Sequence, residues 1–334
     1  MKKIYITSIF LYLISFAVFA QVETNSDSEA ASFLGITPDA RSAGMGGVGT
    51  ALNPDAFSLY HNAASTLFSK EKGAIAFSYA PWMRDLVSGS TLISIGSFYK
   101  INNKQSVVVG FRNFSHPDMN FKDENGNIIE KFTPNEWTFD LGYSRLLTKN
   151  LSMALTLHYI HSDMGSYNGS DAASAVAFDF SVFYQRKTSL MDSATWSVGL
   201  QVANIGSKIK YLDTKYDLPG KVSVGGQLNL PFSKNHILNC ALDLGYQMIP
   251  SGSANFYAGV GAEYTCMKYA VLRAGYHLGD KDKGYNSYGS VGCGVRYYHI
   301  SGDFSYLLAG SDNPLKNSYQ LSIGIDFNLF CSKK

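Results

Sequence analysis

The chain has 334 residues, and its 28 basic and 26 acidic residues nearly balance, so nothing in its charge indicates a nucleic-acid partner. Only 16% of the residues are charged, against roughly 25% in ordinary soluble domains, while 14% are aromatic and 31 are glycine. No run of 18 apolar residues follows the first twenty positions, which excludes transmembrane helices from the sequence pattern. This composition favours a transmembrane β-barrel, with a large soluble β-sandwich as the alternative.

Residues 1–20 have the pattern of a signal peptide. Lys2 and Lys3 precede an almost unbroken apolar stretch over residues 4–19, and a small-residue cleavage site ends at Ala20. Cleavage there removes two lysines and leaves 26 basic and 26 acidic residues, a net charge of zero. No cysteine follows the site directly, so a lipoprotein anchor is not expected; a retained membrane anchor is the alternative.

Residues 21–72 precede the first strand pattern and are predicted to form a periplasmic or plug segment. Within them AGMGGVGTAL, residues 43–52, matches the dinucleotide-binding pattern G-x-G-x-x-G. That pattern holds phosphates only between a buried strand and a helix N-terminus, whereas TPDARS precedes it here. We therefore expect no cofactor. We predict instead that the segment turns tightly and lies against inward-facing side chains, through Gly44, Gly46, Gly47 and Gly49, with Asn62 of YHNAAS as their companion.

Strand patterns begin at residue 73. Apolar residues alternate with polar ones, as at Trp137, Phe139, Leu141 and Tyr143. Most segments reach the length of about 9 to 11 residues that a tilted transmembrane strand needs. The pattern predicts an all-β, 14-stranded antiparallel transmembrane β-barrel over residues 73–330, with a small N-terminal plug or hatch. The segments lie near residues 73–81, 89–100, 105–116, 134–147, 150–162, 174–186, 194–206, 219–230, 235–248, 254–266, 269–278, 288–299, 302–310 and 318–330.

Connections between these segments alternate in length, as the periplasmic turns and external loops of outer-membrane barrels do. Short ones such as TK and MK follow even-numbered strands, and longer polar ones follow most odd-numbered strands. The connections at residues 187–193 and 249–253 fit this rule less well. An even strand count places both chain ends on the periplasmic side, and the cell outer membrane is the expected location.

The first external loop, PWMRDL, contains the apolar residues Trp82, Met83 and Leu86. Exposed apolar side chains at a barrel rim serve either as interfacial anchors or as a protein-docking patch. We predict that they form a partner-docking loop.

Charged residues within the strands share one parity, opposite to that of the apolar set. This parity places them in the lumen, because a charge facing lipid costs up to about 2 to 4 kcal/mol. Two interpretations remain open: a structural network that fills and stiffens the barrel, or a polar conduit for a ligand. The residues are Arg112, Asp140, Asp179, Asp243, Glu263, Arg273, Arg296, Asp303 and Asp326.

No metal or catalytic site is predicted. His158 and His161 lie three residues apart on one strand and therefore point to opposite faces, so they cannot share one ion. The loops GDKDKG and DENGN lack the complete calcium-loop spacing, and the four cysteines lack metal-ligand spacing. No Ser-His-Asp or Cys-His arrangement follows from motif spacing, so the protein is not expected to be an enzyme.

Residues 33–68, FLGITPDARSAGMGGVGTALNPDAFSLYHNAASTLF, resemble the N-terminus of the PorV family, which is grouped with the FadL-like fourteen-stranded outer-membrane barrels. Further similarity lies in YAPWMRDLV, FRNFS, DENGN, PNEWTFDLGYSRLL and HYIHSDM. The resemblance implies a component of the type IX secretion system of Bacteroidetes. Such a component accepts exported cargo proteins from the translocon and carries them to the cell-surface attachment complex.

The resemblance to FadL-like barrels leaves one alternative, a transporter that moves hydrophobic small molecules through a plugged lumen. Those proteins have an Asn-Pro-Ala motif in the hatch, where this chain has Asn62-Ala63-Ala64. The expected partners are therefore outer-membrane lipid and, on the PorV interpretation, cargo proteins and the translocon or attachment complex.

Overall fold

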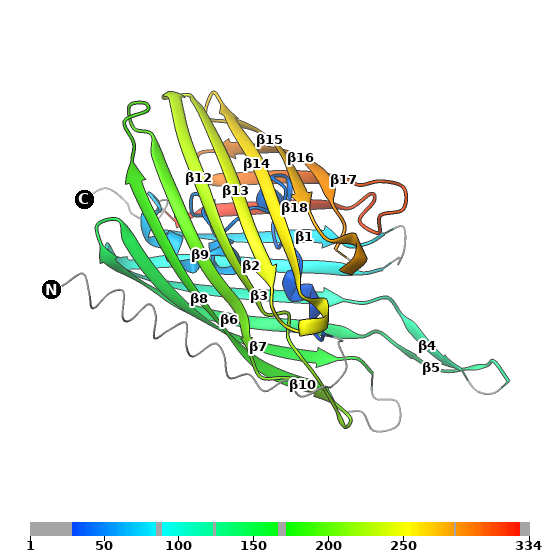
Figure 1. Ribbon diagram of the computed structural model, residues 1–334. Helices are drawn as coiled ribbons and strands as arrows, with labels where there is room; N and C mark the ends of the chain where they lie inside the picture. Colours follow the sequence, from blue (N-terminus) through cyan, green and yellow to red (C-terminus); the bar gives the residue numbers. More distant parts are fainter. Residues whose placement is uncertain (1–28, 85–88, 123–124, 166–171, 284, 328–334) are drawn as a thin grey trace.

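The computed structural model describes residues 29–84, 89–122, 125–165, 172–283 and 285–327. Within them fourteen antiparallel strands form a closed barrel, in which β18 pairs with β1 (Figure 1). This confirms the predicted barrel. The strands of the wall are β1 (Gly73–Pro81), β2 (Thr91–Asn102), β3 (Gln105–Ser115), β6 (Asn135–Thr148), β7 (Leu151–Asp163), β8 (Ala173–Lys187), β9 (Thr195–Gly206), β12 (Lys221–Ser233), β13 (His236–Gln247), β14 (Asn255–Cys266), β15 (Ala270–Leu278), β16 (Tyr288–Tyr297), β17 (Ile300–Leu308) and β18 (Tyr319–Asp326).

Side chains of the wall alternate between the outer surface and the lumen. In β6, Phe139 and Leu141 are each 49% exposed on the outside, while Thr138 and Asp140 are completely buried inside. The outer surface is therefore apolar and the inner surface polar, which is the arrangement that a lipid environment requires of a barrel.

Two further hairpins extend the wall beyond the rim. β4 (Met119–Lys122) pairs with β5 (Ile128–Phe132), and β10 (Ile209–Tyr211) pairs with β11 (Thr214–Tyr216). Figure 1 shows β4 and β5 projecting from the end opposite the short turns. The sequence predicted plain external loops at both places.

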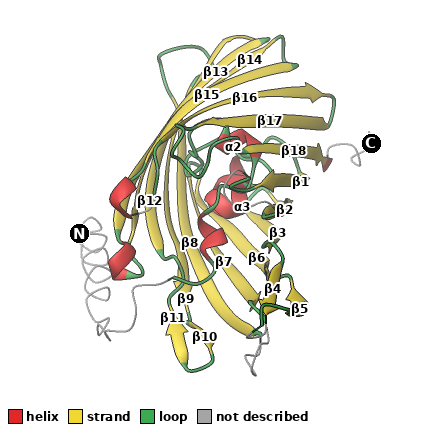
Figure 2. Cartoon of the chain, turned by 90° about the vertical axis from the view of Figure 1, so that its right-hand side faces the viewer, coloured by secondary structure: helices red, strands yellow, loops and turns green. Residues whose placement is uncertain are grey.

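The N-terminal segment lies inside the barrel (Figure 2). Its short helices are η2 (Ser32–Gly35), α2 (Ala40–Ala43), α3 (Ser58–His61) and η3 (Ala63–Phe68), and two more turns, η4 (Ser251–Ser253) and η5 (Lys281–Lys283), lie in loops of the wall. No helix among the described residues is long and apolar enough to cross a membrane.

The described N-terminal segment runs along the lumen from one end of the barrel to the other. The backbone N–H of Ala30 donates to Asp217 O at 2.9 Å, beside the β10–β11 hairpin, and Phe33 stacks on Phe114 at the end of β3. At the other end Lys100 Nζ donates to Ser69 O at 2.5 Å, near the β2–β3 turn. The segment therefore begins at the loop end and runs down the lumen to β1. The chain ends themselves, predicted on the periplasmic side, lie outside the described residues.

Two apolar clusters hold the segment in place. One joins Phe33 and Leu34 to the loop ends of the strands, and the other joins Leu59 and Tyr60 to β2, β3 and β8. The signal peptide and its cleavage site lie outside the described residues, as do residues 328–330 of the predicted last strand. The boundary of the plug at residue 72 stays a prediction.

Candidate functional site

The glycine stretch of residues 44–49 lies directly against the backbone of the wall. Gly46 and Gly47 have φ angles of +74° and +77°, in the left-handed region that favours glycine. A Cβ on Gly46 would lie 2.6 Å from Tyr276 O. The wall contributes its own glycine, because a Cβ on Gly275 would lie 2.1 Å from the carbonyl carbon of Met45.

The backbone donors of this stretch are already used by the barrel. The N–H groups of Gly49 and Thr50 both donate to Asp243 Oδ2, at 2.8 and 2.9 Å. Gly44 approaches the Cα of Gly292, since an added Cβ would lie 3.3 Å from it. The Asp243 carboxylate thus accepts two backbone N–H groups that a nucleotide loop would offer to a phosphate.

Asn62 fixes the second half of the segment. Its buried amide donates to Thr50 O at 2.9 Å and to Val182 O on the wall at 3.0 Å, and its oxygen accepts from Ala64 N–H. The side chain therefore ties two parts of the plug to β8.

The predicted lumen charges fall into separate groups. In the first, His158 lies between two carboxylates, with Nδ1 2.5 Å from Asp140 Oδ1 and Nε2 3.0 Å from Asp179. Arg112 adds a weaker ion pair to Asp140 at 3.9 Å and lies over the Tyr60 ring. All four charged side chains are buried. His158 was not among the predicted lumen residues, although its parity on β7 matches that of the other buried residues of the strand.

The second group centres on a plug residue that the sequence did not single out. Arg41 donates through Nε and a terminal nitrogen to both oxygens of Glu263, each at 3.0 Å, and its other terminal nitrogen contacts Asp55 at 2.9 Å. Glu263 also accepts from Arg273 at 2.7 Å. Asp303 then bridges Arg273 and Arg296, at 2.8 Å from each. This chain of charges joins the plug to β14, β15, β16 and β17.

Asp326 stands apart from both groups. It pairs with His299 at the end of β18, where both side chains are partly exposed. The nine predicted residues therefore do not form one network, because Asp243 holds the glycine stretch, Asp326 lies at the rim and the others divide between two groups.

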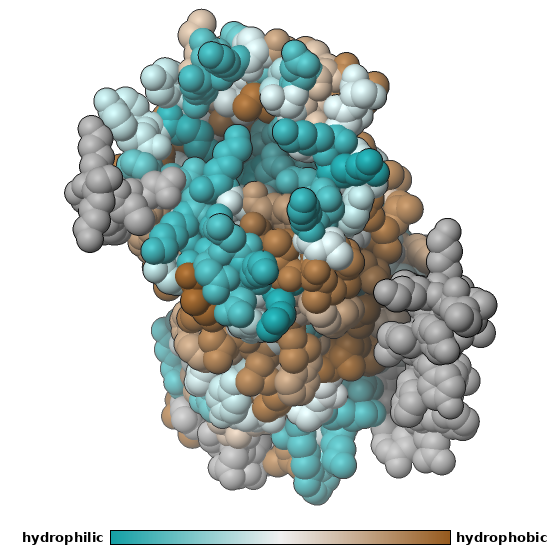
Figure 3. Space-filling view, turned by 90° about the vertical axis from the view of Figure 1, so that its left-hand side faces the viewer, coloured by the Kyte–Doolittle hydropathy of each residue, from teal (hydrophilic) through white to brown (hydrophobic). Residues whose placement is uncertain are grey.

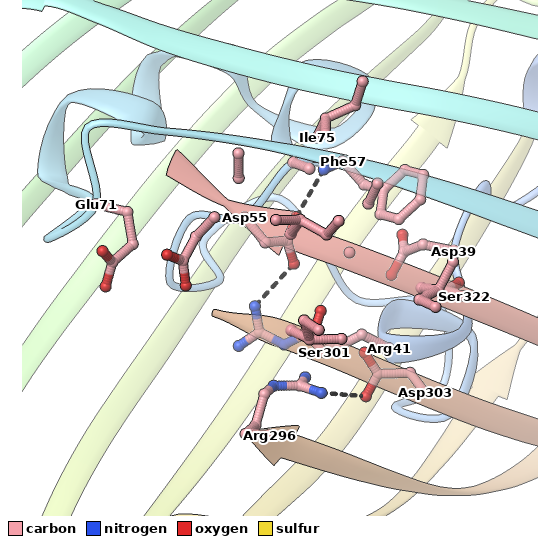
Figure 4. Close-up of a pocket in the computed structure, with 18 of the residues that line it drawn as sticks. Asp39, Arg41, Asp55, Phe57, Glu71, Ile75, Arg296, Ser301, Asp303 and Ser322 are labelled. Carbon is pink, nitrogen blue, oxygen red and sulfur yellow. Dashed lines mark hydrogen bonds and ion pairs between the residues drawn. The ribbon is translucent and has the colours of Figure 1, made fainter. Parts of the chain in front are cut away.

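A cavity of about 300 Å³ lies between the plug and β16, β17, β18 and β1. Figure 4 shows Arg41, Asp55, Arg296 and Asp303 around it. Burial raises the pKa of Asp55 above its ordinary value, despite the neighbouring Arg41. For Asp39 burial acts in the same direction, but its hydrogen bond to His61 at 2.8 Å and the charge of His61 bring its pKa below the ordinary value.

A larger cavity of about 830 Å³, the external vestibule, opens among the long loops. Apolar residues from different loops line much of it, including Met83, Met119 and Met164, together with Pro117, Pro134, Pro219 and Pro314. The N-terminal strap, residues 29–37, forms its floor through Glu29, Ser32 and Ile36. The vestibule adjoins a smaller polar cavity of about 130 Å³ under the strap, with which it shares Thr37 and Tyr285.

The predicted docking residues lie on this vestibule. Trp82 and Met83 are half-buried and line it, and Trp82 packs against the cluster around Phe33. They face inward rather than standing free on the rim. Leu86 lies outside the described residues.

In the described part of the chain, no three or more His, Cys, Asp or Glu side chains form a group that could hold a metal ion. His158 faces the lumen and His161 contacts Ser174 on the outer side, as the strand period predicted.

Solved structures with this fold include two transporters of very different sequence. The toluene transporter TodX of Pseudomonas putida is 11% identical with a TM-score of 0.53, over 85% of this chain and 96% of that chain. The toluene transporter TbuX of Ralstonia pickettii is 11% identical with a TM-score of 0.54, over 86% and 97%. At such identity the likeness shows the fold alone. A search of curated protein sequences finds no significant match.

A family profile identifies the chain more closely. The profile described as "Type IX secretion system protein PorV" matches residues 19–254, well over half of the chain, and covers the N-terminal segment and the wall as far as β13. The protein is an outer-membrane β-barrel and belongs to the PorV family.

Proposed function

We propose that the protein is a non-enzymatic docking and shuttle component of type IX secretion, which binds exported cargo proteins at its external end and carries them from the translocon to the surface attachment complex. Family membership supports this role. The observation that carries it is the external vestibule of about 830 Å³, the largest of the three cavities described, which opens among the long external loops.

The lining of the vestibule suits a partner that varies in sequence. Met83, Met119 and Met164 come from three different loops, and methionine side chains adapt to different apolar surfaces. Trp82 adds an aromatic ring at the same mouth, in keeping with the docking role predicted for this loop.

The filled lumen also favours docking over passage. The cavity of about 300 Å³ at the turn end shares no lining residue with either of the other two cavities. Asp39 lines the cavity at the turn end, and His61 lines the small polar cavity. The hydrogen bond between these two side chains therefore lies between the two cavities.

The test is recovery of cargo from gently solubilised membranes. The triple variant Met83→Gln, Met119→Gln, Met164→Gln should lose most of the co-purifying exported proteins, identified by mass spectrometry. Met267→Gln, at an exposed turn of the opposite end, is the matched control and should recover them in full. Equal recovery from the triple variant would reject the vestibule as the docking site.

The second candidate is a FadL-like transporter of hydrophobic small molecules. Its support is the fold shared with toluene transporters and the apolar part of the vestibule lining. Mass spectrometry of the small-molecule fraction from the same purification separates the two. A lipid-like ligand without associated exported proteins would favour transport.

A further inference from the structure

The short turns of the barrel carry a one-sided charge. Four of the six short connections at this end contain one lysine each, the β2–β3, β6–β7, β12–β13 and β14–β15 turns, and Lys187 ends β8 directly before the β8–β9 turn. Arg145 and Arg186 lie in β6 and β8 just before two of these turns. Asp192 is the only acidic residue within the turns. We refer to Lys104, Arg145, Lys149, Arg186, Lys187, Lys234 and Lys268 as the basic collar.

The collar side chains are exposed and have no ion pair with any described residue. Three lysines at the loop end, Lys131, Lys208 and Lys210, pair with nearby aspartates. Figure 3, which looks onto the turn end, shows hydrophilic side chains gathered there around a hollow. The collar residues therefore have no ion-pair partner among the described residues.

Collar residues adjoin the lipid-facing surface. Arg145 has the outward parity of Tyr143 and Leu147 on β6, which are 40% and 52% exposed. Arg186 pairs in register with Trp196, whose ring contacts Tyr184 at 5.3 Å between centroids. Aromatic side chains in this position mark the boundary between hydrocarbon and headgroups.

We propose that the basic collar binds the anionic phospholipid headgroups of the periplasmic leaflet. Lysine and arginine stems lie along apolar surface while their charges reach the headgroup phosphates. The collar follows turns spread around the ring of strands, as a surrounding lipid shell does, whereas a protein partner would cover one sector. Arg296, near the sixth turn, is excluded from the collar because it pairs inward with Asp303.

The three tryptophans allow a direct test. Trp196 lies at the collar, while Trp137 faces outward near the loop end, in register with Asn113 and His161. In the full chain with Trp82→Phe and Trp137→Phe, Trp196 is the remaining tryptophan, and its fluorescence reports on the lipid beside the collar. In the chain with Trp82→Phe and Trp196→Phe, Trp137 remains and reports on the lipid at the opposite end. Each variant is reconstituted into vesicles that mix phosphatidylcholine with brominated phosphatidylglycerol or with brominated phosphatidylcholine. The brominated lipids quench the fluorescence of the remaining tryptophan, and the extent of quenching gives its relative affinity for the two lipids.

We expect Trp196 to report a preference for phosphatidylglycerol of about fivefold, the effect of one nearby basic side chain at an anionic surface. High salt should reduce that preference, because exposed charges are screened. Trp137 should report no preference. Replacing all seven collar residues, Lys104, Arg145, Lys149, Arg186, Lys187, Lys234 and Lys268, together by glutamine should bring the ratio at Trp196 close to one, because Arg186 lies in register with Trp196.

The matched control replaces seven lysines of the loop end, Lys122, Lys208, Lys210, Lys215, Lys281, Lys283 and Lys316, by glutamine and should keep the preference at Trp196. Heat-modifiable electrophoretic mobility establishes that each variant is folded, and the salt series on the unaltered collar needs no lysine substitution. Equal quenching by the two lipids at Trp196 in the unaltered collar would overturn the proposal and leave an acidic periplasmic protein as the occupant. A preference that survives all seven collar substitutions would overturn it as well.

Discussion

At the scale of single residues, the closest contacts between plug and wall are made by glycines. A Cβ at position 275 would lie 2.1 Å from the carbonyl carbon of Met45 and 2.2 Å from Gly46 N, where only backbone could move. Gly275→Ala should therefore destabilise the barrel by about 1 to 3 kcal/mol, the usual cost of overpacking. Urea unfolding in lipid vesicles measures the change.

Gly226→Ala is the control for that substitution. Gly226 also lies within a wall strand, but it faces outward and its added Cβ would meet nothing closer than Ser197 O at 4.0 Å. It should unfold like the parent chain. A similar loss of stability in both variants would show that glycine is needed for the conformation of the strands rather than for contact with the plug.

Arg41 is the residue on which the second charge group depends. Both Arg41 and Glu263 are largely buried, so Arg41→Met removes the ion-pair partner of Asp55 and leaves Glu263 with Arg273 alone. Breaking such a pair costs about 3 to 5 kcal/mol. A double-mutant cycle of Arg41→Met and Glu263→Gln, measured by urea unfolding, should give a large coupling free energy. The exposed pair Lys210–Asp213 should give almost none in the same experiment.

At the scale of elements, the N-terminal strap should hold less firmly as the pH rises. Burial raises the pKa of Glu29 above its ordinary value of 4.5, and Gln247 donates to the carboxylate at 2.7 Å. Because the folded chain binds this proton more tightly than the unfolded chain, the strap is most stable below pH 4.5 and loses stability as the pH rises through the raised pKa.

Hydrogen exchange of residues 30–36 at several pH values measures this effect. Glu29→Gln should remove the pH dependence of the strap. Glu71→Gln alters a carboxyl whose pKa burial also raises, but at the turn end, and should leave exchange of the strap unchanged. A strap whose exchange responds equally to both substitutions would not be controlled by Glu29.

Elements differed in how far the sequence could predict them. Wall strands were predictable because lipid on one side and polar packing on the other impose a strict alternation over ten or more residues. The β4–β5 and β10–β11 hairpins lie beyond that environment and carry no such pattern. The plug has no period at all, so Arg41 could not be connected with Glu263, which lies 222 positions further along the chain. His158 could have been placed in the lumen by parity alone.

At the scale of the whole molecule, the N-terminal segment crosses the barrel from the loop end to the turn end. Ser32 is exposed in the external vestibule, whereas Ser233 is exposed at the β12–β13 turn. In a chain whose four cysteines are replaced by alanine, Ser32→Cys should react with a membrane-impermeant maleimide on intact cells. Ser233→Cys should react only after the outer membrane is permeabilised.

This pair of variants tests the path of the chain as well as its orientation. The strap is fixed at the loop end by Ala30 and Phe33, and the short turns mark the periplasmic side. Labelling of Ser233→Cys but not Ser32→Cys on intact cells would mean that the barrel is inserted in the opposite sense. Protection of both would mean that the strap lies deeper, below a vestibule that is closed until the external loops move apart.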